Sequence, residues 1–173
     1  MTETKIEQMK LLLVDDDDNV RRALKRVFRK EPYEVEDCNS ARSAMDKLSE
    51  SKFDIILSDF KMPHINGLDF LKWVHDFHPD TIRIMLTGQA DMDTAVRAIN
   101  EGEIYRFFTK PWDDQDLRIS IQIAAEQLKL QRRNLELLNE LNKTKSYVEK
   151  LEQQYPGISK IKRDEEGRII IDE

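Results

Sequence analysis

Five side chains suited to phosphoryl transfer stand directly after short apolar runs of the sequence. They are Asp15, Asp16, Asp59, Thr87 and Lys110. Three carboxylates held close together repel one another, and a hard divalent cation such as Mg²⁺ offsets that repulsion. A hydroxyl and an ammonium beside the carboxylates can bind the oxygens of a phosphoryl group. Each residue alone is a weak signal, since an acid at a strand end is often only a helix cap, but the set predicts phosphoryl transfer to an aspartate.

The apolar runs before these residues are predicted to be strands of one sheet. Residues 10–14, 53–58, 81–86 and 104–108 are short and mainly apolar, and residues 33–38 alternate. Helical spacing between these runs completes five β–α units. They predict an α/β fold, a flavodoxin-like doubly wound parallel sheet with strand order 2-1-3-4-5. Because ligands bind beyond the carboxyl ends of such strands, the five side chains are expected at one edge of the sheet.

Helix boundaries follow from capping and breaking residues. Asp18 and Ser40 are predicted to be N-caps, and Asp91 is predicted to start a further helix. A helix is predicted over residues 67–77, where a proline follows, and the last helix is predicted to begin near Trp112.

Four blocks of the sequence resemble receiver domains of bacterial two-component response regulators. The blocks are residues 11–17 (LLLVDDD), 54–68 (DIILSDFKMPHINGL), 84–88 (IMLTG) and 108–112 (FTKPW). They follow one another in the family's order and spacing, and the resemblance covers roughly residues 9–128. The Met-Pro and Asn-Gly pairs that follow Asp59 are particularly specific.

The resemblance implies roles for the acidic residues. Asp59 resembles the phosphoacceptor, Asp16 a direct ligand of Mg²⁺, and Asp15 a ligand that acts through water. The backbone carbonyl of Lys61 is implied as a further metal ligand. Mn²⁺ can take the place of Mg²⁺ in a site of this kind.

The resemblance also implies roles on the phosphoryl side of the site. Thr87 would hydrogen-bond the phosphoryl group and Lys110 would pair with it. Phe107 matches the aromatic switch position, whose rotamer follows Thr87. Tyr105 is the alternative, because the segment before Lys110 is longer than the commonest family pattern. The peptide bond before Pro111 is implied to be cis.

These roles imply a signalling domain that gains and loses its own phosphoryl group, not an enzyme with a separate substrate. A histidine kinase or a phosphotransfer protein would supply the group, and the surface of the fourth helix, fifth strand and fifth helix would signal to an output. Two alternatives stay open. One is a haloacid-dehalogenase-like phosphatase, because Asp15 and Asp17 form an Asp-x-Asp motif, but the block around Asp59 would then be unexplained. The other is an unphosphorylated assembly scaffold.

The helical pattern continues beyond the expected end of the receiver, to about Gln154. Apolar residues at alternating spacings of three and four predict a coiled-coil seam through Leu117, Ile121, Ala124, Leu128, Leu135 and Leu138. A second register through Leu141, Val148 and Leu151 fits equally well. We expect this helix to form a homodimer, and the alternative is a linker helix that leads to a missing output domain.

Three segments are therefore expected. They are a receiver domain over residues 9–128, a coiled-coil extension over residues 129–154, and a β-hairpin or fragment of a further module over residues 155–173.

The composition argues against other classes of function. The net charge is −6 and Lys and Arg form no block, which argues against nucleic-acid binding. No apolar run approaches the ~20 residues of a membrane span. The single cysteine, Cys38, cannot form an internal disulfide and fits a cytoplasmic setting. The histidines share no metal-ligand spacing, so a zinc site is not expected.

Overall fold

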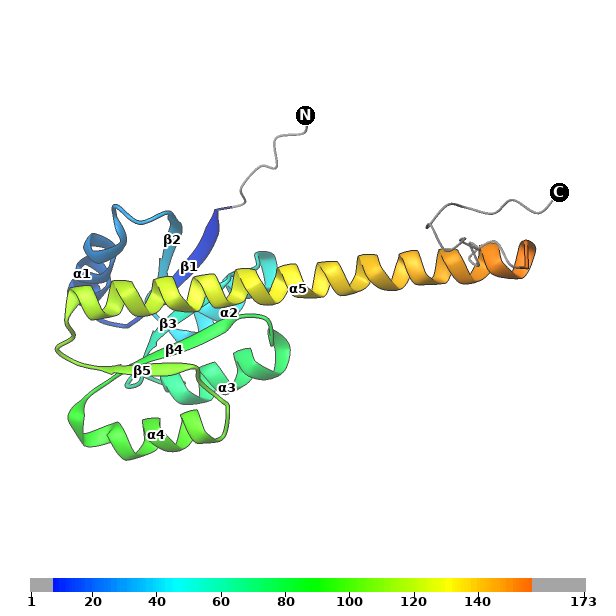
Figure 1. Cartoon of the computed structure of the whole chain (residues 1–173). Helices are drawn as coiled ribbons and strands as arrows, with labels where there is room; N and C mark the ends of the chain where they lie inside the picture. The colour runs from blue at the N-terminus through cyan, green and yellow to red at the C-terminus, as the bar shows by residue number, and fades with distance from the viewer. Residues whose placement is uncertain (1–7, 157–173) are drawn as a thin grey trace. The chain divides into compact units, whose positions relative to one another are not determined.

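The computed structural model describes residues 8–156, and their five strands form one parallel sheet (Figure 1). The elements are β1 (Met9–Val14), α1 (Asp18–Phe28), β2 (Tyr33–Cys38), α2 (Ala41–Glu50), β3 (Ile55–Asp59), α3 (Gly67–Phe77), β4 (Ile82–Thr87), the short 3-10 helix η1 (Gln89–Asp91), α4 (Met92–Asn100), β5 (Arg106–Thr109) and α5 (Asp114–Gln154). The strand order β2-β1-β3-β4-β5 confirms the predicted flavodoxin-like topology. The predicted hairpin concerns residues 157–173, which lie outside the described residues.

The two central strands β1 and β3 are buried along almost their whole length because helices cover both faces of the sheet. Leu12, Ile56 and Met85 point into a cluster with α2, α3 and α4. Their neighbours Leu11 and Ile55 point the other way, into a cluster with α1 and the first turns of α5. Figure 1 shows the first turns of α5 lying against one side of the sheet and α3 and α4 on the other. Alternate residues of each strand therefore serve two separate cores.

The first turns of α5 belong to the core of the domain. Leu117, Ile121 and Ala124 are fully buried, and Leu128 is 4% exposed. The predicted coiled-coil seam is therefore wrong for these four residues, because they already pack inside one chain. A core stripe and a coiled-coil seam share the same spacing, so the sequence alone does not separate them.

The chain divides into two compact units between Leu128 and Lys129. In the second unit, α5 continues to Gln154 and its leucines are exposed, for example Leu130 at 64% and Leu141 at 62%. No helix among residues 8–156 is both long and apolar enough to cross a membrane.

Two helix starts show how the caps operate. Ser40 caps α2 as predicted, with its hydroxyl accepting a hydrogen bond from the Ser43 amide at 3.2 Å. The prediction for Asp18 was wrong, since Asp17 is the N-cap of α1 and accepts from the Asn19 amide at 2.8 Å. Asp18 instead begins the helix and pairs with the arginines of the next turn. Either acid suits the positive end of a helix, so the sequence does not decide which of the two neighbouring residues is the N-cap.

Candidate functional site

The carboxyl ends of β1 and β3 bring three acids together. Asp15 follows β1 directly, Asp59 ends β3, and the two strands pair with Val14 opposite Ser58. One carboxylate oxygen from each of Asp15, Asp16 and Asp59 lies within 4.8 Å of the others. Asp15 and Asp59 are buried, whereas Asp16 is exposed. The structure thus assembles the acidic cluster that the strand ends predicted.

Lys110 supplies the positive charge inside this cluster. Its ammonium lies 2.7 Å from an oxygen of Asp15 and 2.7 Å from an oxygen of Asp59. Its amide donates to the Thr87 carbonyl at 2.8 Å, and the bond to Pro111 is cis, as the resemblance implied. Burial tends to lower the pKa of Lys110, but the hydrogen bonds to Asp15 and Asp59 outweigh it and raise the pKa. The lysine is therefore held in its charged form.

One ammonium does not neutralise three carboxylates. The pKa of Asp59 is raised, first by burial and then by the charges of Asp15 and Asp16, although Lys110 opposes the shift. The site is therefore short of positive charge at neutral pH. A set of three carboxylates with this deficit fits a hard divalent cation, which prefers oxygen ligands.

Thr87 and Phe107 occupy neighbouring strands at the same end of the sheet. Thr87 is fully buried at the end of β4, and its hydroxyl donates to the Gly88 carbonyl at 3.2 Å. Phe107 lies in β5 and packs, half-buried, against the core beneath α2, α3 and α4. Tyr105 precedes β5 and donates its hydroxyl to Gln127 at 3.0 Å. Of the two aromatic residues, Phe107 therefore lies in the strand beside Thr87, whereas Tyr105 is hydrogen-bonded to α5.

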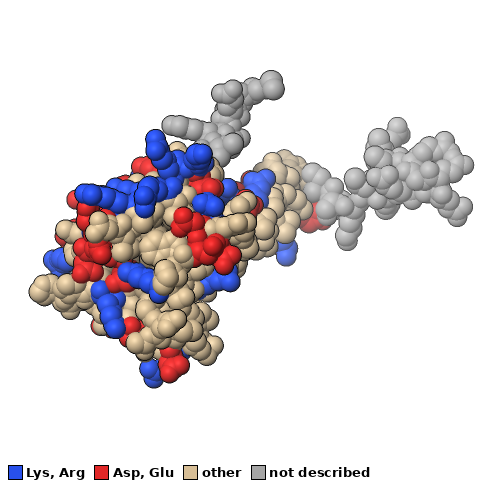
Figure 2. All heavy atoms as spheres, turned by 90° about the vertical axis from the view of Figure 1, so that its left-hand side faces the viewer, with Lys and Arg blue, Asp and Glu red and all other residues tan. Residues whose placement is uncertain are grey.

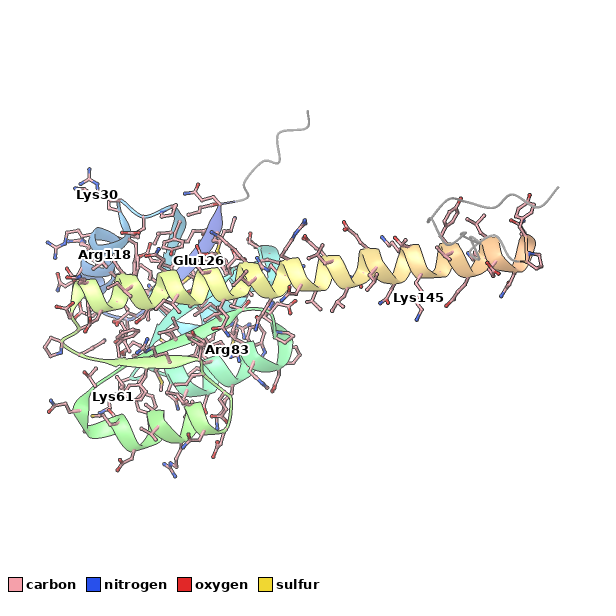
Figure 3. The ribbon with its side chains drawn as sticks, in the orientation of Figure 1. Lys30, Lys61, Arg83, Arg118, Glu126 and Lys145 are labelled. Carbon is pink, nitrogen blue, oxygen red and sulfur yellow. The ribbon has the colours of Figure 1, made fainter. Side chains whose placement is uncertain are left out.

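The side chain of Lys61 turns towards a residue that the sequence did not connect with the site. Its ammonium lies 2.9 Å from Asp91, in η1. Asp91 takes the N-cap position of α4 but makes no capping hydrogen bond. Figure 3 places Lys61 beside the start of α4, at the end of the sheet where α5 begins. Figure 2 views the molecule from that end and shows acidic and basic side chains interspersed over it. No sequence pattern indicates such a pair, because the two residues lie in separate loops.

Arg21 was also missed by the sequence analysis. Its guanidinium donates to the backbone carbonyl of Asp15 at 2.7 Å and to the carboxylate of Asp37 at 3.1 Å. The first helix thus fixes the backbone that carries the buried acid. In the sequence, the position of Arg21 one turn after the run of acidic residues is only a weak indication that it contacts them.

Gly67 approaches the backbone of Asp59 more closely than any other residue type could. A Cβ atom built on Gly67 would lie 1.8 Å from the carbonyl oxygen of Asp59 and 2.9 Å from the Cα of Phe60. The amide of Gly67 donates to the Phe60 carbonyl at 2.8 Å, and Asn66 caps α3. The Asn-Gly pair therefore anchors the loop against the end of β3.

This fold and cluster match a known family over most of the chain. The sequence model of the response regulator receiver domain matches residues 11–122. The chain belongs to the response regulator receiver domain family. Receiver domains of this family are the signalling domains of two-component systems, so the domain is a signalling module, consistent with phosphorylation-dependent control.

Several relatives of this receiver are known. The hydrogenase transcriptional regulatory protein HoxA of Bradyrhizobium diazoefficiens is 31% identical over 150 residues, which is 87% of this chain and 31% of the relative. The regulatory protein AtoC of Escherichia coli is 32% identical over 117 residues, or 68% of this chain and 25% of the relative. This chain thus spans a third or less of the length of these relatives.

Solved structures show the same receiver architecture. The signal receiver domain of an HD domain-containing protein from Pseudomonas fluorescens superposes with a TM-score of 0.70 at 32% identity, covering 77% of this chain and 98% of that one. A receiver domain protein from Clostridium thermocellum gives 0.66 at 31% identity, covering 70% of this chain and 98% of that one. The two similarities thus cover about three quarters of this chain and nearly the whole of each receiver domain structure.

Proposed function

We propose that this receiver accepts a phosphoryl group on Asp59, from a histidine kinase or a phosphotransfer protein, and signals to an output. The observation that carries the proposal is the buried Asp59 carboxylate, placed beside Lys110 and two further acids at the open end of the sheet. A carboxylate that is desolvated and held in place by an ammonium is oriented for attack on phosphorus. The bond from phosphorus to the donor breaks as the bond to the Asp59 oxygen forms.

We assign the metal to the acidic cluster. Asp15, Asp16 and Asp59 would hold Mg²⁺ or Mn²⁺ together with the backbone carbonyl of Lys61, and the cation would neutralise charge on the phosphoryl oxygens. Lys110 is already charged and needs no proton to bind those oxygens. Thr87 would give up its bond to Gly88 in order to donate to the phosphoryl group. Phe107 would then follow Thr87 inward.

The surface that receives this change is partly apolar. Side chains that are large, hydrophobic and at least a third exposed occur on α4, just before β5 and on α5, and they are Met92, Val96, Tyr105, Ile119 and Ile123. A change in α4 or β5 would alter this surface, which supports its use in contact with an output or a partner. The buried free thiol of Cys38 is compatible with the cytoplasmic setting that a histidine kinase partner requires.

A phosphorylation assay tests the proposal. With Mg²⁺ and acetyl phosphate, the intact protein should gain the mass of a single phosphoryl group, and acetate should be released. Asp59→Ala should show no gain, and a chelator should abolish the gain in the unaltered protein. If the gain survives Asp59→Ala and disappears in Asp15→Ala, the phosphatase alternative is correct. If neither acetyl phosphate nor a kinase phosphorylates the unaltered protein, the domain is a scaffold.

We propose that residues 9–128 are the receiver and that residues 129–154 are a coiled coil that joins two copies of the chain. Twofold pairing is the commonest arrangement of identical chains. In the second unit, a seam with spacings of three and four can be drawn through positions that are apolar with two exceptions. It runs through Leu130, Asn134, Leu137, Leu141, Thr144, Val148 and Leu151. The other seam, through Leu135 and Leu138, would continue to Asn142, Lys145 and Glu149, which are polar or charged. The register through Leu141 is therefore the better coiled-coil seam.

Matched leucine substitutions test the dimer and its register. Leu141→Glu should convert a dimer to a monomer, because a charge on the seam must be desolvated or must separate the helices. Leu135→Glu, which is equally exposed but lies off the seam, should leave the dimer intact. Light scattering at tens of micromolar reports the mass of each variant. A monomeric unaltered protein contradicts the coiled coil and leaves a linker helix.

A further inference from the structure

The ion pair between Lys61 and Asp91 connects two loops on either side of the acceptor strand's end. Lys61 follows Asp59 in the loop after β3, and Asp91 follows Thr87 in the turn after β4. The two charged groups are 2.9 Å apart. We have assigned the backbone carbonyl of Lys61 to the proposed metal site, so its side chain would stay within reach of that site.

The two partners differ in exposure. The Lys61 side chain is 69% exposed, whereas that of Asp91 is 18% exposed. The Oδ2 oxygen of Asp91 is itself buried and accepts no hydrogen bond of good geometry, so the Lys61 ammonium is its charged contact within residues 8–156. This oxygen turns back towards Gly88, since a Cβ on Gly88 would lie 3.8 Å from it. The carboxylate therefore depends on a lysine that is free to move.

We propose that Asp91 is a positioning residue that holds the Lys61 ammonium at α4 until Asp59 is phosphorylated, when the phosphoryl group takes the ammonium over. This inference rests on the proposed phosphorylation of Asp59. A phosphoryl group carries close to two negative charges and three acceptor oxygens, so it competes well with a single carboxylate. Lysine suits this exchange because its ammonium is a compact charge on a flexible stem.

The exchange has a consequence for α4. Once Lys61 leaves, the buried Oδ2 of Asp91 has no countercharge and must find another donor. Asp91 already holds the N-cap position of α4 with its side chain unused for capping, so the unpaired amides of the first helical turn are the nearest donors. Phosphorylation would thus reach α4 through Lys61 and Asp91, by a route separate from Thr87 and Phe107.

A double-mutant cycle on the phosphorylated protein tests the inference. After removal of the donor, Asp91→Asn should slow the loss of the phosphoryl group by about two- to fivefold, the size expected for a partly solvated ion pair. The reason is that a freed Lys61 can remain on the phosphoryl oxygens and shield the phosphorus from water. In a Lys61→Met background, Asp91→Asn should have no effect on the rate. Asp93→Asn, which removes an exposed charge from the same helical turn, should have no effect in either background.

Hydrogen exchange supplies a readout of α4 itself. Phosphorylation should change the exchange of the amides at Asp93 and Thr94, which an N-cap side chain at Asp91 can reach, and should leave them unchanged in Lys61→Met. The inference is overturned if Asp91→Asn changes the rate of phosphoryl loss equally with and without Lys61, or changes it in neither background. Either result would leave the mass gain on Asp59, and thus the proposed function, intact. If the unaltered protein gains no phosphoryl mass, the proposed function is wrong, and the inference that rests on it is wrong as well.

Discussion

Gly67→Ala is expected to lower the free energy of unfolding by about 3 kcal/mol or more, the upper end of the range for overpacked sites. The added methyl group would meet the carbonyl oxygen of Asp59 at 1.8 Å and the carbonyl carbon at 2.7 Å. Both are backbone atoms at the end of a central strand, so neither can move without displacing β3. Urea denaturation followed by circular dichroism measures the loss. Any folded fraction should also be phosphorylated slowly, because the acceptor is displaced.

Two other glycines provide matched controls. A methyl group on Gly88 would have only an ordinary contact at 3.8 Å, so Gly88→Ala should change stability by about 0.5 kcal/mol or less. Gly102 has open space around it but a φ of 75°, so Gly102→Ala should cost about 1 kcal/mol from backbone strain alone. If Gly67→Ala is as mild as Gly88→Ala, the close approach to Asp59 is not present in solution.

Lys110→Met is expected to destabilise the metal-free protein by roughly 2–3 kcal/mol. The substitution leaves the buried carboxylates of Asp15 and Asp59 without the ammonium that contacts both. Breaking a buried pair by removing one partner typically costs 3–5 kcal/mol, and the lower figure reflects the 27% exposure of the Lys110 side chain. Denaturation in chelator measures the effect, and added Mg²⁺ should recover part of the loss.

The loss from Lys110→Met should depend on pH in a defined direction. Burial already raises the pKa of Asp59, and Lys110 is the group that lowers it, so the pKa should rise further without the lysine. A carboxyl whose pKa is raised on folding opposes folding when ionised, and the folded state gains stability as the pH falls through that pKa. The difference between variant and unaltered protein should therefore shrink from about pH 8 to pH 5.

A lysine elsewhere in the domain controls for the general loss of charge. Lys72 pairs with Glu103 at 2.9 Å, away from the acidic cluster, and Lys72→Met should cost at most about 1 kcal/mol at every pH. A loss for Lys110→Met that stays constant over the same pH interval would contradict the coupling to Asp59.

Most of the fold was predictable because its strands are covered on both faces. Continuous apolar runs such as residues 10–14 leave little choice but a buried parallel strand, and the order of the units follows from chain topology. The ends of elements were less predictable, as β5 is confined to Arg106–Thr109 where residues 104–108 were expected. Hydrogen bonds to the neighbouring strand decide such ends, and composition carries little information about them.

The site was predictable only in its outline. Residues at strand ends were identifiable from topology, and the structure gathers Asp15, Asp16 and Asp59 accordingly. The pair of Lys61 and Asp91 was not predictable, because contacts between loops depend on where each loop turns. The part of the predicted seam from Leu117 to Leu128 was wrong for a related reason, because the pattern of an apolar helix stripe does not identify the surface that covers it.

The position of α5 in the core has a consequence for the synthesis of the protein. Leu117 and Ile121 share a cluster with Leu11 and Leu13 of β1, so the first strand to leave the ribosome is covered by the last helix of the domain. At about 5–20 residues per second, the chain from Thr109 to Leu128 takes roughly one to four seconds to make. For that time one face of the completed sheet is covered only by α1, and the apolar surface left open favours binding by a chaperone. Any segment that follows Leu128 therefore emerges while the domain before it is only just closing.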